Sequence, residues 1–321
     1  YAWRAEIAYH EERFLDLLAD KEKAYALDPM SLQLSADLAA EYRNFWRPKD
    51  AERVIDRMFE LHPHHPLAYW AATANLGFHG RYAEAVLMLE QAKEAHPENE
   101  EFRHFHGHAL LMLGLLEEAE AVGDKDVLVE SAVLNGDMEL ARERLEAGLA
   151  SGEDRGKWLA AGRFLNQIDR SEGSAAQLRA QVKQSLDYWD TRNYDWASDC
   201  WPALIHQMAE AGLEAETEPM MSECERSMEE RYEARYLCPC MMYGVVQYTI
   251  LSGRLEEAVE RADYWLSNGD SHYLLHLDPI FSQLSSHPRY ADLLARNASH
   301  QARQREIYLA NRNDVPTAFH P

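Results

Sequence analysis

The feature that most constrains this chain is a period of 34 residues in its N-terminal part. Pro29, Pro63 and Pro97 follow one another at that interval, and Ala51 and Ala85 are separated by the same distance. Proline cannot continue a helix interior, so the prolines mark the boundaries of a recurring unit. A recurring unit of this length predicts stacked copies of one short supersecondary structure rather than a single enclosed core.

The unit is best defined at residues 69–97. Apolar residues recur at helical spacing on both sides of Gly80, and glycine commonly ends a helix. Ala85 is a small residue at which two helices can approach closely, and Pro97 closes the unit. The unit is therefore predicted to be two helices joined by a short turn. Because no segment alternates apolar and polar residues in the manner of a strand, the predicted fold class is all-α.

The order of residues in this unit, from Tyr69 through Gly80 and Ala85 to Pro97, resembles the tetratricopeptide repeat (TPR). The resemblance implies a right-handed α-solenoid of helical hairpins whose first helices line a concave groove. It places a regular array of about four repeats, the first one clipped, over residues 1–122. Such arrays are interaction scaffolds, so the expected function is non-catalytic binding of a peptide or a partner domain.

The remainder of the chain departs from the regular period. Residues 123–175 are expected to hold a degenerate hairpin and an irregular connection, and residues 176–270 further TPR-like hairpins. Capping helices and a tail are expected at residues 271–321. Apolar spacing and turn residues predict helices at 127–135, 138–149, 157–168, 175–188, 196–211, 219–235, 241–251, 255–267 and 298–309.

A second resemblance concerns residues 278–294. Asp278, Phe281, Pro288 and Leu294 fit the DPxFxxLxxxPRFxxLL-type segment with which many bacterial signalling proteins end, after a series of tetratricopeptide repeats. The upstream domain of those proteins is commonly a class III adenylyl or guanylyl cyclase or a winged-helix DNA-binding domain. We therefore expect this chain to be the C-terminal part of a larger bacterial signalling protein. The alternatives are a stand-alone adaptor and a scaffold that associates with itself as a homodimer.

The chain carries 32 Lys and Arg against 55 Asp and Glu, a formal net charge of −23. This excess disfavours nucleic acid and membranes as partners, because phosphate groups and anionic lipids attract clustered positive charge. The longest apolar run, Ala109–Leu116, is too short to span a bilayer, which takes about 20 residues. Four cysteines without framework spacing favour a reducing compartment, so the expected location is the cytoplasm.

The resemblance to tetratricopeptide repeats also implies which residues face the groove. Aromatic and polar side chains fall at the groove positions of the first helices, and such a lining suits an extended or helical peptide. For Trp70 and Phe78, packing between repeats is the alternative. The predicted partner contacts are Trp3, Tyr9, Arg43, Asn44, Trp70, Phe78, His104 and His108.

Metal and catalytic sites are not expected. His104 and His108 are spaced as two ligands on one helix face, but no third or fourth ligand is evident, so we predict no metal and no cofactor. Neither a Gly-rich phosphate loop nor a GxSxG or HExxH motif occurs, so the chain is not predicted to be an enzyme. The alternative is an enzyme with its site in residues 176–240. That region contains Trp189, Trp196, Cys200, Trp201 and His206.

Overall fold

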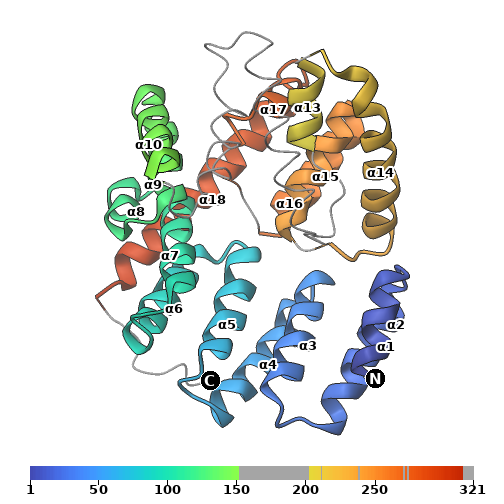
Figure 1. Ribbon diagram of the computed structural model, residues 1–321, viewed down its shortest axis with the longest axis vertical. Coiled ribbons are helices and arrows are strands. Elements are labelled where there is room, and N and C mark those ends of the chain that lie inside the picture. Colours follow the sequence, from blue (N-terminus) through green and yellow to red (C-terminus); the bar gives the residue numbers. More distant parts are fainter. Residues whose placement is uncertain (152–201, 211, 238, 270–271, 273–274, 314–321) are drawn as a thin grey trace.

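The computed structural model describes residues 1–151, 202–210, 212–237, 239–269, 272 and 275–313. Within these ranges every regular element is a helix, and no strand occurs. The helices pair as hairpins that stack side by side along the chain (Figure 1). The predicted class, a right-handed α-solenoid of TPR-like hairpins, is therefore confirmed.

The helices of the first four hairpins repeat with the predicted period. The second helix of each hairpin begins at position 14, 48, 82 or 116, and the later first helices begin at positions 32, 66 and 100. Each start therefore lies 34 residues after the one before it. These helices are α1 (Ala2–His10), α2 (Phe14–Leu27), α3 (Leu32–Asn44), α4 (Pro48–Leu61), α5 (Pro66–Phe78), α6 (Tyr82–Ala95), α7 (Glu100–Met112) and α8 (Leu116–Val122).

The turn inside each of these hairpins has one backbone conformation. Its φ angle is positive in all four: 56° at Glu12, 56° at Trp46, 70° at Gly80 and 66° at Gly114. Glycine reaches this left-handed region freely, whereas other L-residues lose about 1–2 kcal/mol there. Trp46 adopts it nevertheless, and its ring lies 5.6 Å from the ring of Tyr264. The hairpin geometry thus imposes the turn even where the sequence lacks glycine.

Small buried residues mark where the second helices pack. Ala51, Ala85 and Ala119, which are spaced by 34 residues, are at most 1% exposed. Larger side chains such as Met58 and Leu89 fill the neighbouring positions and are equally buried. Enlarging one of the alanines would push apart helices that already pack at interior density, and overpacking of this kind destabilises a core.

Beyond Gly123 the helices no longer follow the 34-residue period, although the predicted hairpins at 127–149 and 241–267 are present. The degenerate hairpin consists of α9 (Lys125–Leu134) and α10 (Met138–Ser151). The predicted helices at 157–168 and 175–188 lie outside the described residues, as do residues 196–201. The described C-terminal helices are α13 (Pro202–Glu210), α14 (Glu214–Glu233), α15 (Pro239–Leu251), α16 (Leu255–Ser267), α17 (Pro279–Ser282) and α18 (Tyr290–Asn311).

Two predicted boundaries are wrong. α14 begins at Glu214, five residues before Pro219, which therefore lies inside the helix. Proline deletes one backbone hydrogen bond there, but the residues that follow it continue the helix. The last helix also begins earlier than predicted, because α18 runs without interruption from Tyr290 to Asn311. No glycine or proline occurs between these two residues, so nothing in the local sequence ends the helix.

The C-terminal half returns to the N-terminal repeats, and the first contact is made by the segment that follows α14. The ring of Tyr236 stacks on that of Phe14, with 4.2 Å between the ring centroids. The Tyr236 hydroxyl donates a hydrogen bond to Glu41 at 2.9 Å. The backbone N–H of Leu237 donates to the carbonyl oxygen of Asn44 at 3.0 Å. These contacts join the C-terminal half to α2 and α3.

The second contact is made by α18, which reaches from the C-terminal helices to α6 (Figure 1). The Tyr308 hydroxyl donates a hydrogen bond to Glu90 at 2.7 Å. Nearer the start of α18, the imidazole of His300 is hydrogen-bonded to the carbonyl oxygen of Gly80 at 2.8 Å. The segment after α14 thus contacts the first two hairpins, and α18 contacts the third. The C-terminal half therefore folds back on the repeats, and the chain does not end as an open solenoid.

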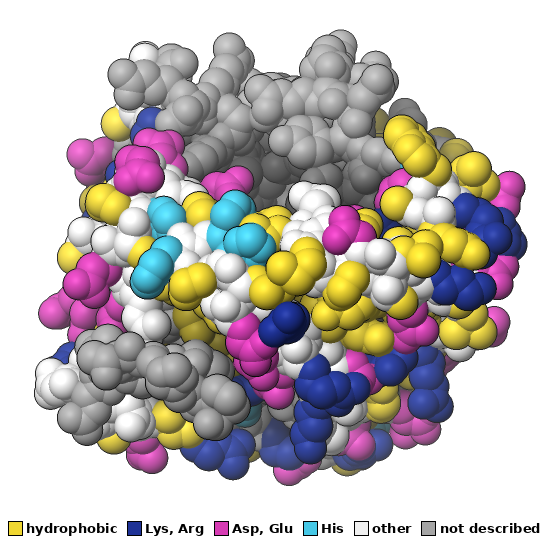
Figure 2. Space-filling model, turned by 90° about the horizontal axis from the view of Figure 1, so that it is seen from below, with side chains coloured by type: hydrophobic (Ala, Val, Ile, Leu, Met, Phe, Trp, Pro, Cys, Tyr) yellow, Lys and Arg dark blue, Asp and Glu magenta, His cyan; other side chains and the backbone are white. Residues whose placement is uncertain are grey.

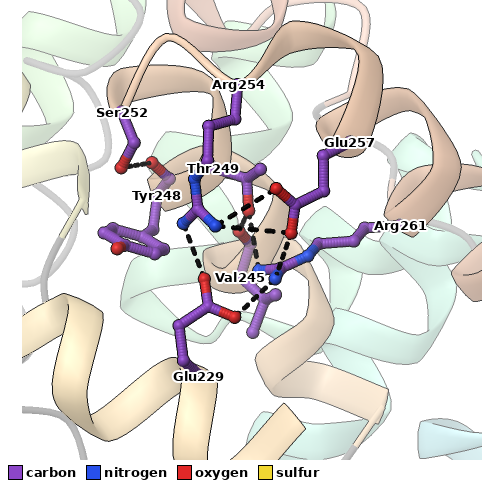
Figure 3. A network of polar contacts seen from close by, with 8 residues as sticks. All are labelled: Glu229, Val245, Tyr248, Thr249, Ser252, Arg254, Glu257 and Arg261. Atoms are coloured by element: carbon purple, nitrogen blue, oxygen red, sulfur yellow. Dashed lines mark hydrogen bonds and ion pairs between the residues drawn. The ribbon is translucent and has the colours of Figure 1, made fainter. Parts of the chain in front are cut away.

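A buried ion-pair network holds the C-terminal helices together (Figure 3). Arg261 is 3% exposed, and its Nη2 atom lies 2.5 Å from the carboxylates of both Glu229 and Glu257. Its Nη1 atom donates a hydrogen bond to the Thr249 hydroxyl at 2.9 Å. Glu229 also accepts from Arg254 at 2.6 Å. The network therefore links α14, α15 and α16.

This network predicts a pH-dependent contribution to stability. Desolvation raises the pKa of Glu229, but hydrogen bonds and charge from Arg261 and Arg254 outweigh it, so the pKa lies below its usual 4.5. The stabilisation is thus present above pH 4.5 and is lost as the pH falls through the lowered pKa. We expect Glu229→Gln to reduce the free energy of unfolding at pH 7 by about 1–3 kcal/mol. Its urea-unfolding stability should also decline less than that of the wild type below pH 4.5.

The control for this prediction is Glu257→Gln. Glu257 also pairs with Arg261, but its side chain is 38% exposed, against 23% for Glu229. Solvent screens an exposed pair, so this variant should lose no more than about 1 kcal/mol. Equal losses in the two variants, or parallel pH profiles for Glu229→Gln and the wild type, would contradict the prediction.

One further observation bears on the expected location. Cys224 in α14 is fully buried and disulfide-bonded. Disulfides are typical of oxidising environments, so this bond does not fit the reducing compartment expected from the cysteine count. Among the described helices, none is long and apolar enough to cross a bilayer.

Candidate functional site

A cavity of about 290 Å³ lies between the third and fourth hairpins and the C-terminal half, and we call it the inner cavity. α5, α6 and α7 supply most of its wall, and α16 supplies Trp265. Its wall is largely apolar. Its large side chains are Trp70, Phe78, Tyr82, Phe105, Met112 and Trp265.

α5 presents one face to the inner cavity. Trp70, Ala74 and Phe78 follow one another at intervals of four residues, which places them on one side of a helix. Ala74 and Gly77 carry little or no side chain, so space remains between the two aromatic rings. The fourth hairpin adds His108 to the same cavity. Three of the predicted partner contacts, Trp70, Phe78 and His108, are thereby brought together.

Arg43 from α3 lies against the two aromatic rings of α5. Its guanidinium carbon is 4.9 Å from the centre of the Phe78 ring and 5.8 Å from that of Trp70. Burial lowers the pKa of Arg43 to about 10, so the group remains charged at neutral pH. A desolvated cation over an aromatic ring contributes about 2 kcal/mol. Because Arg43 is only 8% exposed, it positions the rings and offers little surface for the predicted partner contact.

A second hollow, of about 610 Å³, crosses the starts of α3, α5 and α7, and we call it the first-helix groove. Small residues, Ala36 and Ala40, and acidic residues, Asp37 and Glu101, are among those that line it. Trp70 lines both this groove and the inner cavity. Seen from below, hydrophobic side chains form a band across the molecule, with histidines beside it (Figure 2).

The remaining predicted contacts lie elsewhere. The ring of Tyr9 is 6.4 Å from that of Tyr236, and the side chain of Asn44 donates a hydrogen bond to the Tyr236 hydroxyl at 3.3 Å. Both side chains therefore contact the C-terminal half of their own chain. Trp3 is 85% exposed on α1 and lines neither the inner cavity nor the first-helix groove.

Two histidines of α7 face three carboxylates from the start of the degenerate hairpin. The rings of His104 and His108 are 4.5 Å apart between centroids. His104 Nδ1 lies 3.2 Å from Asp124 and 3.7 Å from Asp126. His108 Nδ1 lies 3.3 Å from Glu130. We call these five residues the histidine–carboxylate cluster.

Neighbouring charges and burial shift the pKa values of His108 and Asp126 in this cluster. Desolvation lowers the pKa of His108, but the adjacent Glu130 outweighs it, and the pKa rises to about 8. Desolvation raises the pKa of Asp126, and the like charge of Asp124 adds to this effect. His272, which lines the inner cavity together with His108, has its pKa lowered to about 4 by desolvation. Near neutral pH these shifts favour the protonated form of His108 and the neutral form of His272.

The alternative enzyme site is only partly described. Trp189, Trp196, Cys200 and Trp201 lie outside the described residues. His206 lies in α13, where its Nε2 atom is 3.6 Å from the carboxylate of Glu210.

Sequence reasoning missed several residues of these sites, and four of them show why. Trp265 and His272 reach the inner cavity because the C-terminal half folds back, and no spacing in the sequence indicates that contact. Asp126 and Glu130 do carry a signal. They are four residues apart on α9, as His104 and His108 are on α7, so each pair occupies one face of its helix.

No family model and no curated protein matches the chain. Among solved structures, it is similar to one described as the APC/C hetero-tetramer Cut9–Hcn1, with a TM-score of 0.43 and 13% identity over 92% of this chain. It is also similar to the structure of Naa15/Naa10 bound to HypK-THB, with a TM-score of 0.30 and 16% identity over 97% of this chain. The chain spans 54% and 58% of the length of those two chains.

Proposed function

We propose that this protein is a non-catalytic scaffold that binds a peptide or an exposed segment of a partner protein along the inner side of its repeats. In this proposal a large apolar side chain of the partner enters the inner cavity. The flanking residues of the partner lie along the first-helix groove. The proposal depends above all on one observation, the apolar inner cavity bordered by Trp70 and Phe78.

The size and the wall of the inner cavity suit an apolar anchor. Its volume of about 290 Å³ is close to the lower end of the range for ligand pockets. Aromatic and methionine side chains are enriched where proteins bind one another, because they bury much area and lose little conformational entropy. Hot spots in interfaces are of this kind, with one anchor residue in a well-packed pocket.

The negative charge of the chain indicates which residues flank the apolar anchor of the partner. The chain has a net charge of −23, and Asp37 and Glu101 line the first-helix groove. Opposite charge on a partner speeds association and suppresses wrong partners. The partner segment is thus expected to carry basic residues beside its apolar anchor.

The wider context remains part of the proposal. The DPxFxxL-type segment supports a place in a larger bacterial signalling protein, of which this chain would be the C-terminal scaffold. A cytoplasmic location goes with that context. Self-association is the second candidate, in which the partner segment belongs to another copy of the chain.

The proposal is tested by filling the inner cavity. We expect a displayed peptide library, selected on the purified protein, to yield peptides with one large apolar residue flanked by basic ones. Ala74→Phe should weaken their binding at least tenfold, because the new ring occupies the space between Trp70 and Phe78. Fluorescence anisotropy with a labelled peptide measures the loss. The matched control, Ala121→Phe, changes an exposed alanine of α8 and should leave the affinity unchanged.

A second variant shows whether a loss of peptide binding is caused by the altered cavity or by misfolding. Trp70→Ala combined with Phe78→Ala enlarges the inner cavity instead of filling it, and it should also abolish peptide binding while circular dichroism shows intact helices. The proposal fails if no peptide is enriched, or if binding survives in both variants. A molar mass of twice the monomer together with an absence of peptide binding would favour self-association.

A further inference from the structure

The histidine–carboxylate cluster has the composition of a metal site. One ligand atom each from His104, His108 and Asp126 lies within 4.8 Å of the other two. Two imidazoles and one carboxylate form a three-ligand set of the kind found in catalytic zinc sites. The pair on α7 alone would not suffice, and the third ligand comes from α9.

The distances are compatible with coordination. Zn–N and Zn–O bonds of about 2.0–2.2 Å place neighbouring ligand atoms of a tetrahedral site about 3.3 Å apart. His104 Nδ1 and Asp126 Oδ2 are already 3.7 Å apart. Small side-chain rotations would close the remaining difference, and His104 and His108 are only half-buried and can make them.

Asp126 supplies an independent observation. The residue is 9% exposed, and its Oδ1 atom is buried without a hydrogen-bond partner. A buried carboxylate oxygen that lacks a partner loses its hydration without compensation, which is costly. A bound cation would satisfy this atom.

The surroundings resemble those of metal ligands in a further respect. Ligating histidines commonly donate their second ring N–H to a carboxylate, which fixes the ring and raises its basicity. Glu130 lies 3.3 Å from Nδ1 of His108 and can play this part, leaving Nε2 for a metal.

We propose that His104, His108 and Asp126 bind one divalent transition-metal ion, with Zn²⁺ as the expected ion, and that Glu130 orients His108. Nitrogen and carboxylate donors in a three-ligand set suit Zn²⁺ better than Mg²⁺ or Ca²⁺, which prefer oxygen ligands only. Such a site keeps an open fourth position. Because His108 also lines the inner cavity, the ion would adjoin the place where a partner is proposed to bind. The metal site does not depend on that binding function.

The test is direct metal binding by the full chain. Protein stripped with a chelator is titrated with Zn²⁺ in a calorimeter, and with Co²⁺ while the visible absorption of the tetrahedral ion is recorded. We expect saturation at one equivalent per chain. His104→Gln combined with His108→Gln should lower the affinity by more than the 10–100-fold that outer-shell substitutions cost. Asp126→Asn should do the same, and Glu130→Gln should weaken binding about tenfold.

The matched control is His64→Gln combined with His65→Gln. These two exposed histidines lie in the turn before α5 and belong to a separate histidine-rich stretch, so binding should be unchanged. The proposal is overturned if the protein binds no metal, or if binding persists in the His104/His108 variant and is lost in the His64/His65 variant. Circular dichroism of each metal-free variant establishes that it is folded.

Discussion

Gly80→Ala is expected to destabilise the protein by several kcal/mol, whereas Gly114→Ala, at the equivalent place in the next repeat, should cost only about 1–2 kcal/mol. Both glycines have positive φ angles, 70° and 66°, so a side chain is strained at either position. Only Gly80 is also packed against the C-terminal half. A methyl group there would overlap the carbonyl oxygen of Gly269 and come within 2.7 Å of the carbonyl carbon. Nothing lies within 4 Å of a methyl group at Gly114.

Both variants strain the turn equally, because the two repeats share their turn geometry. The difference between their losses of stability therefore measures the contact between Gly80 and the C-terminal half. Urea unfolding measures both free energies. Hydrogen exchange should show faster exchange in α18 of Gly80→Ala, because His300 loses its bond to the carbonyl of Gly80 when the two surfaces separate. Equal losses of stability in the two variants would mean that the contact with Gly269 contributes nothing to the fold.

Asp278→Ala is expected to reduce the free energy of unfolding by about 2–4 kcal/mol. Asp278 is 2% exposed and caps α17, because its Oδ1 atom accepts from the N–H of Ile280 at 2.8 Å. Its Oδ2 atom accepts from the Gln247 side chain at 2.5 Å and from the Tyr243 hydroxyl. Alanine would remove the cap and leave the buried Gln247 amide, which is 3% exposed, with an unpaired donor. Thermal and urea unfolding measure the loss.

Two further variants provide comparisons for the stability that Asp278→Ala loses. Asp278→Asn keeps an oxygen for the cap but places an amide nitrogen opposite two donors, so its loss should be intermediate. Asp292→Ala removes an exposed carboxylate that pairs with Arg296 at 3.1 Å, and its cost should stay below about 0.5 kcal/mol. If Asp278→Ala cost no more than Asp292→Ala, the polar cluster would not be a stabilising element.

The repeat array could be predicted from sequence because its interactions are local. Each hairpin packs mainly on its neighbours, so the residues that begin, end and space the helices recur with the period. For this reason one second helix begins at Pro48, and the next two begin two residues after Gly80 and Gly114. The polar contacts that Asp278 makes with Gln247 and Tyr243 carried no such periodic signal.

The candidate sites could be predicted only in part. The resemblance to tetratricopeptide repeats implied Trp70 and Phe78 as groove residues, and helical spacing placed His104 and His108 on one face of α7. Their depth and their neighbours depend on contacts between residues far apart in sequence. Arg43 stacks on the two rings from another repeat, and Tyr236 covers Tyr9 and Asn44 from the C-terminal half.

The amino-acid sequence was enough to predict the all-α class, the 34-residue hairpin and the faces of α5 and α7 that carry aromatic and histidine side chains. These follow from local periodicity, which is set by the geometry of a single helix or of adjacent helices. Three further features depend on non-local packing: the solenoid closes on itself, Trp265 and His272 help to line the inner cavity, and Asp126 joins the two histidines. Closure depends on the summed geometry of many hairpins and on non-local packing, and no single stretch of sequence encodes it.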